Sequence, residues 1–174
     1  GDRDPYLAAE EWFNIEHQTY PYGHHIAVVK VDRETGEVKI EKYFIAYDIG
    51  RAINPMMIEG QLVGGLAQGI GGALYEEFTY DERGEPLSVT FMDYLLPTAS
   101  DMPPLSVIHM KTPSPLNALG FKGLGEGGAI APPVVIANAV CDALKPFKAE
   151  INATPVRWET IAAILGHDLG DKTA

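Results

Sequence analysis

A glycine-rich segment with helical periodicity constrains the fold of this chain more than any other feature. Asn54-Pro55 supplies an N-cap and a first-turn proline, and apolar residues then recur at helical spacing up to about Phe78. This pattern predicts a helix over about 55–75. Each glycine inside a helix costs about 1 kcal/mol relative to alanine. The predicted helix contains six of them, at Gly60, Gly64, Gly65, Gly69, Gly71 and Gly72.

The glycines share one stripe of this helix with two glutamines. Gln61 and Gln68 lie within about 20° of each other around the helix axis, and Gly65 and Gly72 fall on the same stripe. One interpretation is a bare backbone face on which a polar, planar ligand is hydrogen-bonded by the two amides. The other is close packing of a helix or strand against small residues. Sequence geometry alone favours neither.

Strand patterns occur on both sides of this helix. From His25 a β-branched run, a turn at 33–36 and a second apolar run predict a β-hairpin. A second turn at 81–84 lies between strand candidates, and 105–110 is a further strand candidate.

Two more helices are expected towards the C-terminus. One begins at Pro132-Pro133, and the other is capped by Thr154-Pro155, with Trp158, Ile161, Ala162 and Leu165 inside and Gly166 at its end. Strands and helices do not alternate strictly. The expected fold class is therefore α+β, with hairpins and short strands packed with about three helices. We expect an arm or linker over 1–23, one folded unit over 24–166 and a tail over 167–174.

The segment 122–128, with the sequence KGLGEGG, formally contains G-x-G-x-x-G at Gly123, Gly125 and Gly128. A dinucleotide-binding turn needs a preceding strand and a helix whose free N–H groups face a pyrophosphate. Here the preceding segment is broken by prolines, the next helix opens with two residues that lack an N–H, and Glu126 is negatively charged. We therefore predict a loop without a Rossmann function.

Glu126 is a lone carboxylate among four glycines, an arrangement that can present it into a cavity. Burial with few neighbouring charges would raise its pKa towards the working pH, as general base catalysis requires. The alternative is a turn glutamate that points into water. The residues leave both open.

Composition excludes several other classes of function. Thirteen Lys and Arg against 24 Asp and Glu give a net charge of −11, which argues against nucleic-acid binding. No apolar run reaches the roughly 18 residues of a membrane span. His17, His24 and His25 do not complete a tetrahedral metal site and are expected at a surface or interface. The single cysteine, Cys141, is expected to be a buried structural thiol, and Asp48 a loop-ordering acid.

Three strings together resemble the C-terminal cofactor-binding region of the xanthine oxidase family of molybdenum hydroxylases. They are DIGRAINP at 48–55, EGQLVGGLAQGIGG at 59–72, and KGLGEGG at 122–128 running into Ala131-Pro132-Pro133. The likeness extends over about 24–165, and is nearest to large subunits of the aerobic carbon monoxide dehydrogenase and aldehyde oxidoreductase type. It implies that the fold is part of a larger molybdopterin-binding domain.

The resemblance also implies site residues. It gives Glu126 the role of the base in an oxidative hydroxylation of an aldehyde, an N-heterocycle or a CO-type substrate. It implies molybdopterin with molybdenum, in the cytosine dinucleotide form, and no metal ligand from this chain. The residues implied in cofactor binding are Gln61, Gly65, Gln68, Gly69, Lys122, Gly123, Leu124 and Gly125.

The complete large subunits of this family are several times longer than this chain. The resemblance therefore implies a fragment or split subunit that is inactive alone. The remainder of the large subunit would complete the site, and iron–sulfur and FAD centres would lie on partner chains. We expect a cytoplasmic protein. The alternative function is a non-catalytic interaction module that scaffolds assembly of such a complex.

Overall fold

The computed structural model describes residues 7–14 and 16–167 of the chain. Residues 7–14 and 16–21 carry no helix or strand, and most of the predicted tail, 168–174, lies outside the described residues. The elements follow in the order β1 (Tyr22–Val31), β2 (Val38–Asp48), α1 (Pro55–Leu74), the 3-10 turn η1 (Ala99–Asp101), β3 (Leu105–Met110), α2 (Pro132–Ala143), the 3-10 turn η2 (Lys145–Phe147) and α3 (Trp158–Ile164).

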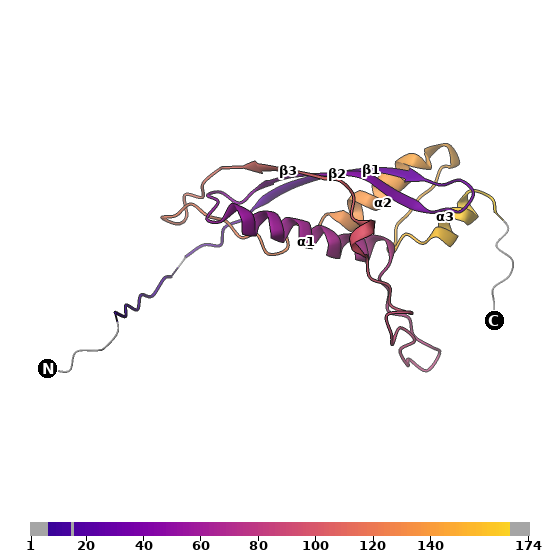
Figure 1. The fold of residues 1–174 in the computed structure, drawn as a ribbon, viewed down its shortest axis with the longest axis horizontal. Helices are drawn as coiled ribbons and strands as arrows, with labels where there is room; N and C mark the ends of the chain where they lie inside the picture. The colour runs from indigo at the N-terminus through magenta and orange to yellow at the C-terminus, as the bar shows by residue number, and fades with distance from the viewer. Residues whose placement is uncertain (1–6, 15, 168–174) are drawn as a thin grey trace.

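The strands form one sheet in the order β1-β2-β3 (Figure 1). β1 and β2 are the predicted antiparallel hairpin, whereas β3 adds parallel to β2 with Tyr43 opposite Leu105. The hairpin turn forms because the Asp32 carboxylate accepts hydrogen bonds from the N–H groups of Glu34 and Thr35. The predicted hairpin and the 105–110 strand are thus confirmed.

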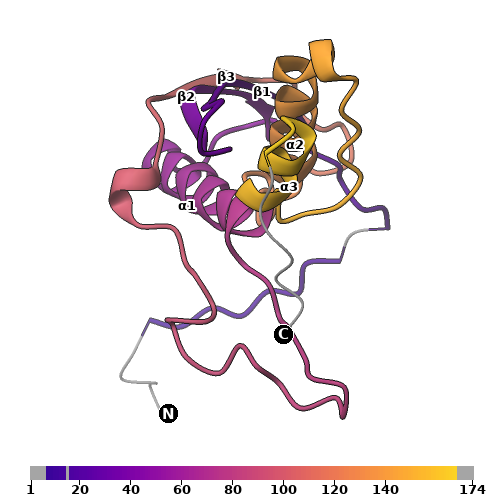
Figure 2. The ribbon, with the colours of Figure 1, turned by 90° about the vertical axis from the view of Figure 1, so that its right-hand side faces the viewer.

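α1 and α2 lie on the same side of the sheet and enclose the core with it (Figures 1 and 2). Inward-facing residues of β2 alternate with exposed ones, so Tyr43 and Ile45 are fully buried. The helices add apolar stripes to the same core, with Leu62, Leu66 and Ile70 from α1 and Ile136 and Val140 from α2. This mixed arrangement confirms the α+β fold class.

The first two predicted helices are confirmed, since α1 and α2 begin at the expected prolines. The Asn54 side chain accepts a hydrogen bond from the Met57 N–H at 3.3 Å and so caps α1 as expected. None of the helices in the described part of the chain combines the length and hydropathy needed to cross a membrane.

The predicted start of the third helix is wrong. α3 begins at Trp158, after an N-cap at Arg157. The preceding Val156 N–H donates a hydrogen bond to the Ala73 carbonyl at the end of α1, at 2.7 Å, so this segment is held outside a helix. Trp158, expected inside, is 50% exposed, whereas Ile161 and Ala162 are buried and Gly166 follows the helix with φ of 85°.

The strand candidates around the second turn are also not strands. The turn itself forms, because the Asp81 carboxylate accepts hydrogen bonds from the N–H groups of Arg83 and Glu85. Only an isolated bridge joins Tyr80 to Pro86. The segment extends away from the sheet (Figures 1 and 2), so its apolar side chains have no layer on which to pack.

Candidate functional site

Residues 122–128, here called the glutamate loop, form a tight turn beside the N-terminal half of α1. The Gly127 N–H donates to the Leu124 carbonyl at 2.8 Å, and the Ala129 N–H donates to the Glu126 carbonyl at 2.9 Å. Glu126 is exposed, and its side chain makes no hydrogen bond within the described residues. Of the two interpretations that the sequence leaves open, the described chain shows the exposed turn glutamate, because no described segment covers the turn.

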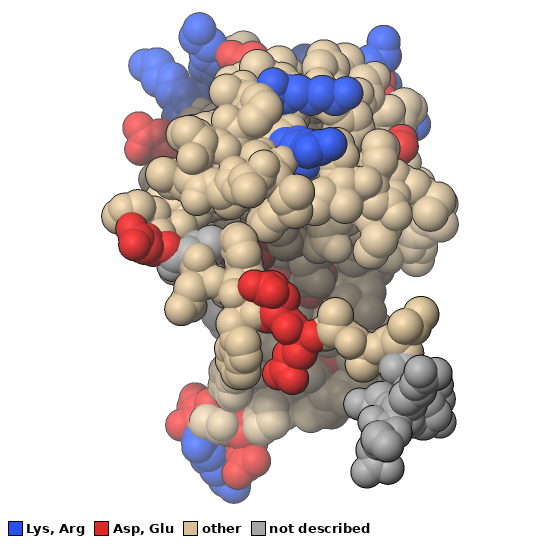
Figure 3. Space-filling model, turned by 90° about the vertical axis from the view of Figure 1, so that its left-hand side faces the viewer, with Lys and Arg blue, Asp and Glu red and all other residues tan. Residues whose placement is uncertain are grey.

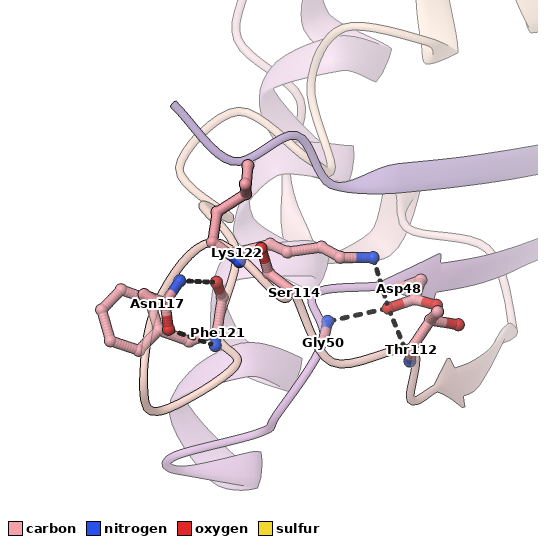
Figure 4. Close-up of polar contacts among 8 residues, drawn as sticks. Asp48, Gly50, Thr112, Ser114, Asn117, Phe121 and Lys122 are labelled. Atoms are coloured by element: carbon pink, nitrogen blue, oxygen red, sulfur yellow. Dashed lines mark hydrogen bonds and ion pairs between the residues drawn. The ribbon is translucent and has the colours of Figure 1, made fainter. Parts of the chain in front are cut away.

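A buried ion pair fixes the first residue of the loop (Figure 4). Lys122 Nζ lies 3.3 Å from Asp48 Oδ1, and the two side chains are only 6% and 4% exposed. The same oxygen accepts hydrogen bonds from the N–H groups of Gly50 and Thr112, at 2.7 and 3.2 Å. Asp48 is therefore the loop-ordering acid that the sequence predicts. The Lys122 ammonium, also 4.6 Å from the centre of the Tyr22 ring, is occupied by these contacts.

The contacts of Asp48 set its ionisation. Burial alone raises the pKa of this carboxyl, but hydrogen bonds from the side chain and N–H of Thr112, the N–H of Gly50 and the Lys122 ammonium outweigh it. They lower the pKa of Asp48 to about 2. Asp48 is therefore ionised at neutral pH, as its partner Lys122 requires.

An amide pair closes the segment that leads into the glutamate loop (Figure 4). Asn117 donates to the Phe121 carbonyl at 2.9 Å and accepts from the Phe121 N–H at 3.2 Å. Phe121 directly precedes Lys122, so the loop enters its turn from a fixed position.

α1 holds the middle and the end of the loop. Gln61 Nε2 donates a hydrogen bond to the Gly125 carbonyl at 2.5 Å. A Cβ atom on Gly65 would lie 2.7 Å from the Gly128 Cα, and one on Gly69 would lie 2.7 Å from the Pro132 ring. Close packing, one of the two interpretations from the sequence, thus accounts for Gly65 and Gly69.

The remaining residues of this stripe and the neighbouring glycines of α1 do not touch the loop. A Cβ atom on Gly60, Gly64 or Gly72 would meet nothing within 4 Å in the described part of the structure. Gln68 is also exposed. The bare stripe that the sequence predicts is therefore divided into a packed part at the loop and an open part that faces away from the core.

Aromatic side chains of the β1–β2 hairpin pack beneath the glutamate loop, on the side of the sheet. Tyr47 lies against Gly127, where a Cβ atom would be 2.5 Å from the ring. His25 packs edge-on against Tyr47 and Tyr43 and is only 8% exposed. The expected surface position of His25 is therefore wrong, whereas His17 and His24 are exposed. Alternation places His25 on one face of β1 with Ala27, but Ile26 and Val28 make the opposite face equally apolar in the sequence, so the pattern did not show which face is inward.

A cavity of about 370 Å³ opens between α1 and the glutamate loop. Its lining includes Gln61, Lys122, Leu124 and Gly125 of the predicted cofactor residues, together with Arg51 and Met57. Gly65, Gln68, Gly69 and Gly123 lie outside this lining. Among the described residues, the N–H groups of 123–126 donate no hydrogen bond, and of these residues Leu124 and Gly125 line the cavity.

The end of the molecule at which β2 and β3 finish carries few charges (Figure 3). Basic side chains stand on an otherwise mostly uncharged surface, with acidic side chains below them. Arg51 and Lys111 line a neighbouring cavity of about 610 Å³ on the far side of the 111–120 loop. Despite the net charge of −11, this end can therefore accept an anionic group.

Two further sequence expectations concern metals and thiols. No group of three or more His, Cys, Asp or Glu residues is placed to hold a metal ion within 7–14 and 16–167. Cys141, expected to be buried, is only partly so, because it lies at the edge of α2 away from the buried Ile136 and Val140.

Comparisons with known proteins identify the family of this chain. Residues 3–103 match the family described as the molybdopterin cofactor-binding domain. The chain belongs to this family. It is also 41% identical over 155 residues to the nicotine 6-hydroxylase large subunit of Paenarthrobacter nicotinovorans, covering 87% of this chain and 19% of that protein. It is 39% identical over 140 residues to the carbon monoxide dehydrogenase large chain of Hydrogenophaga pseudoflava, covering 80% of this chain and 17% of that protein.

Solved structures give the same result for this chain. Quinoline 2-oxidoreductase from Pseudomonas putida 86 superimposes with a TM-score of 0.80 at 41% identity, covering 83% of this chain and 18% of that one. A Cu,Mo-CO dehydrogenase superimposes with a TM-score of 0.85 at 34% identity, covering 90% of this chain and 20% of that one. The chain is thus a member of the xanthine oxidase family of molybdenum hydroxylases and spans about a fifth of the length of these relatives.

Proposed function

We propose that this chain supplies the base and part of the cofactor cradle for an oxidative hydroxylation catalysed by a molybdenum hydroxylase. The substrate class would be an aldehyde, an N-heterocycle or a CO-type molecule. The observation that carries the proposal is the exposed Glu126 carboxylate on a loop whose neighbouring residues are held by Asp48, Gln61, Gly65 and Tyr47.

The residues around the cavity fit a molybdopterin group. This group is planar and rich in hydrogen-bond acceptors. The loop offers the unused N–H groups of Leu124 and Gly125 at a cavity of about 370 Å³, with those of Gly123 and Glu126 beside them in the chain. Gly123, Leu124 and Gly125 would bind it through the backbone, and Gln61 and Gln68 through their amides. Gly65 and Gly69 would act by letting the loop approach α1, and Lys122 by anchoring it. When bound, the cofactor supplies oxygen transfer and accepts two electrons from the substrate.

In this proposal the chain's own chemistry is a proton transfer to a carboxylate oxygen of Glu126. Gly123 and Gly125, before Glu126, leave space for the reacting groups within the described structure, while the four contacts limit how far the carboxylate can move. The remainder of the large subunit would cover the exposed carboxylate and exclude water from it. We therefore expect the chain to be inactive alone, as a fragment or split subunit.

The relatives suggest further features of the complete enzyme. One is named as a subunit of a 6-hydroxypseudooxynicotine dehydrogenase complex, which supports partner chains here. We propose the cytosine dinucleotide form of the cofactor, iron–sulfur and FAD centres on those partner chains, and a cytoplasmic location. A purely scaffolding module is not favoured, since a scaffold has no use for an exposed carboxylate on so rigid a turn.

Replacement of Glu126 by glutamine in the complete enzyme tests the proposal. Glu126→Gln keeps the size of the side chain but removes the proton acceptor, so turnover should fall by about 10²- to 10⁴-fold with molybdenum content near that of the parent. Steady-state kinetics and metal analysis measure the two quantities. Glu82→Gln, at an exposed turn glutamate far from the cavity, is the matched control. Turnover of Glu126→Gln within a few-fold of the parent would contradict the proposal.

A further inference from the structure

A buried histidine lies directly beneath the glutamate loop and takes no part in the proton transfer proposed above. His25, on β1, is 8% exposed and packs between two tyrosine rings of β2. Its ring centre is 5.7 Å from that of Tyr43 and 6.5 Å from that of Tyr47, with interplanar angles of 85° and 75°. Two edge-on aromatic contacts therefore fix the orientation of the imidazole.

The two ring nitrogens have different surroundings. Nδ1 lies 3.1 Å from the Tyr43 hydroxyl. Nε2 is buried and has no hydrogen-bond partner among the described residues. The backbone of Gly127 raises the pKa of the His25 ring, which places a hydrogen-bond acceptor of that residue near the imidazole. Because an unpaired polar atom in a protein interior is costly, Nε2 requires a partner, and Gly127 is the available one.

The tautomer follows from the Tyr43 hydroxyl. Burial raises the pKa of Tyr43, so its hydroxyl keeps its proton and, being fully buried, must donate it. The acceptor within reach is His25 Nδ1, which leaves the ring hydrogen on Nε2. The opposite tautomer would leave both the Tyr43 hydrogen and the Nε2 lone pair unpaired. Hydrogen-bond satisfaction therefore favours a donor at Nε2 that faces the loop.

The charge state of the imidazole agrees with this arrangement. Burial lowers the pKa of His25, the Gly127 backbone raises it, and the neighbouring His24 lowers it, with a net decrease. A neutral ring has one donor and one acceptor, which matches one tyrosine hydroxyl on one side and one backbone carbonyl on the other.

We propose that His25 is a positioning residue for Glu126, acting as a neutral imidazole whose Nε2–H donates to the Gly127 carbonyl and fixes the glutamate loop from below. Gly127 is the residue next to Glu126, so a hydrogen bond to its carbonyl restrains the carboxylate through one peptide unit. Tyr47 supports the same residue by contact. This inference rests on the proposed role of Glu126 as the base.

Two substitutions of His25 separate its hydrogen bonds. In His25→Gln the side-chain amide can replace Nε2 as a donor to Gly127, whereas His25→Asn is too short and retains only a polar atom near Tyr43. In the complete enzyme, His25→Asn should lower kcat at least about ten-fold, because a misplacement of about 1 Å can cost up to about 10²-fold. KM and molybdenum content should stay near the parent values. His25→Gln should recover kcat to within a few-fold of the parent.

Equal kcat in the parent and His25→Asn would overturn the proposal. Equal losses in both variants, accompanied by loss of molybdenum, would also overturn it, since they indicate a purely structural role. A fall in kcat that only His25→Asn shows, with the metal retained, supports positioning through the Nε2 hydrogen bond.

Two measurements on the full chain do not depend on activity. Imidazole ¹⁵N NMR should show hydrogen on Nε2 and none on Nδ1 of His25, and the opposite tautomer would refute the proposal. Amide hydrogen exchange over 124–129 should be faster in His25→Asn than in the parent or His25→Gln, and unchanged exchange would also refute it. If Glu126→Gln keeps full turnover while these measurements succeed, the proposed base fails and the hydrogen bond from His25 to the loop stands.

Discussion

Gly65 on α1 provides the sharpest test of how the glutamate loop is held. The perturbation is Gly65→Ala, which adds a single methyl group to the helix. That methyl carbon would lie 2.7 and 2.9 Å from the Cα and carbonyl carbon of Gly128, and 3.0 Å from the Ala129 N. All three are backbone atoms, so no side-chain rotation can relieve the contact.

The expected magnitude combines two opposing effects. Alanine favours a helix over glycine by about 1 kcal/mol. Carbon atoms normally approach to about 3.5–4.0 Å, so the new methyl overlaps the loop by about 1 Å, and overpacking of this kind costs about 1–3 kcal/mol. Gly65→Ala should therefore leave the free energy of unfolding unchanged or lower it by up to about 2 kcal/mol.

Gly64→Ala is the matched control, because a Cβ atom there meets nothing within 4 Å in the described structure. Its helix-propensity gain of about 1 kcal/mol is unopposed, so it should stabilise the chain. The difference between the two variants isolates the clash with the loop and should be about 1–3 kcal/mol in urea unfolding of the full chain followed by circular dichroism. If Gly65→Ala stabilises the chain as much as Gly64→Ala, the close packing of α1 on the loop is refuted.

Two further predictions concern the other contacts of the loop. The pKa of Asp48 in the folded chain, about 2, lies below its ordinary value of 3.8, so its stabilising contribution is complete above pH 5 and is lost as the pH falls towards 2. In unfolding experiments at a series of pH values, the free energy of unfolding of the parent should fall on the acid side. The fall should be smaller in Asp48→Asn, by up to about 2 kcal/mol, and equal falls in the two proteins would contradict this prediction. Gln61→Leu should lower the free energy of unfolding by about 0.5–1 kcal/mol through its lost bond to Gly125, whereas the exposed Gln68→Leu should change it by less than about 0.5 kcal/mol. Identical effects of the two glutamine variants in denaturant unfolding would show that the Gln61 bond contributes nothing.

Local patterns were sufficient to predict most of the secondary structure. The hairpin, α1 and α2 each depend on signals within their own segments, namely β-branched runs about a turn or a proline at the start of an apolar period. α3 was misplaced because its start depends on a hydrogen bond from Val156 to Ala73, a residue at the end of another helix. No sequence pattern near Val156 indicates that contact.

The site shows the same division. Glu126 and the glycines around it could be singled out from the sequence, but their partners could not. The bond from Gln61 to Gly125 spans 64 residues and the ion pair of Asp48 with Lys122 spans 74. His25 was missed for another reason. Both faces of β1 carry apolar residues, with Ile26 and Val28 on one and Ala27 and Val29 on the other, so a period of two does not show which face is inward. Because histidine is polar, His25 was expected at a surface or interface.

The glycines of the glutamate loop divide at Glu126 itself. After it, Gly127 lies on the Tyr47 ring and Gly128 lies against the backbone of α1, so each is required by close packing. Before it, a Cβ atom on Gly123 or Gly125 would meet nothing within 4 Å of the described chain. In a dinucleotide-binding motif the glycines serve a tight turn, the approach of the backbone to a pyrophosphate, and helix–strand packing. Here the same spacing arises from two other requirements, a packed anchor after the carboxylate and open space before it. The proposed role of Glu126 as a base beside a cofactor would need both.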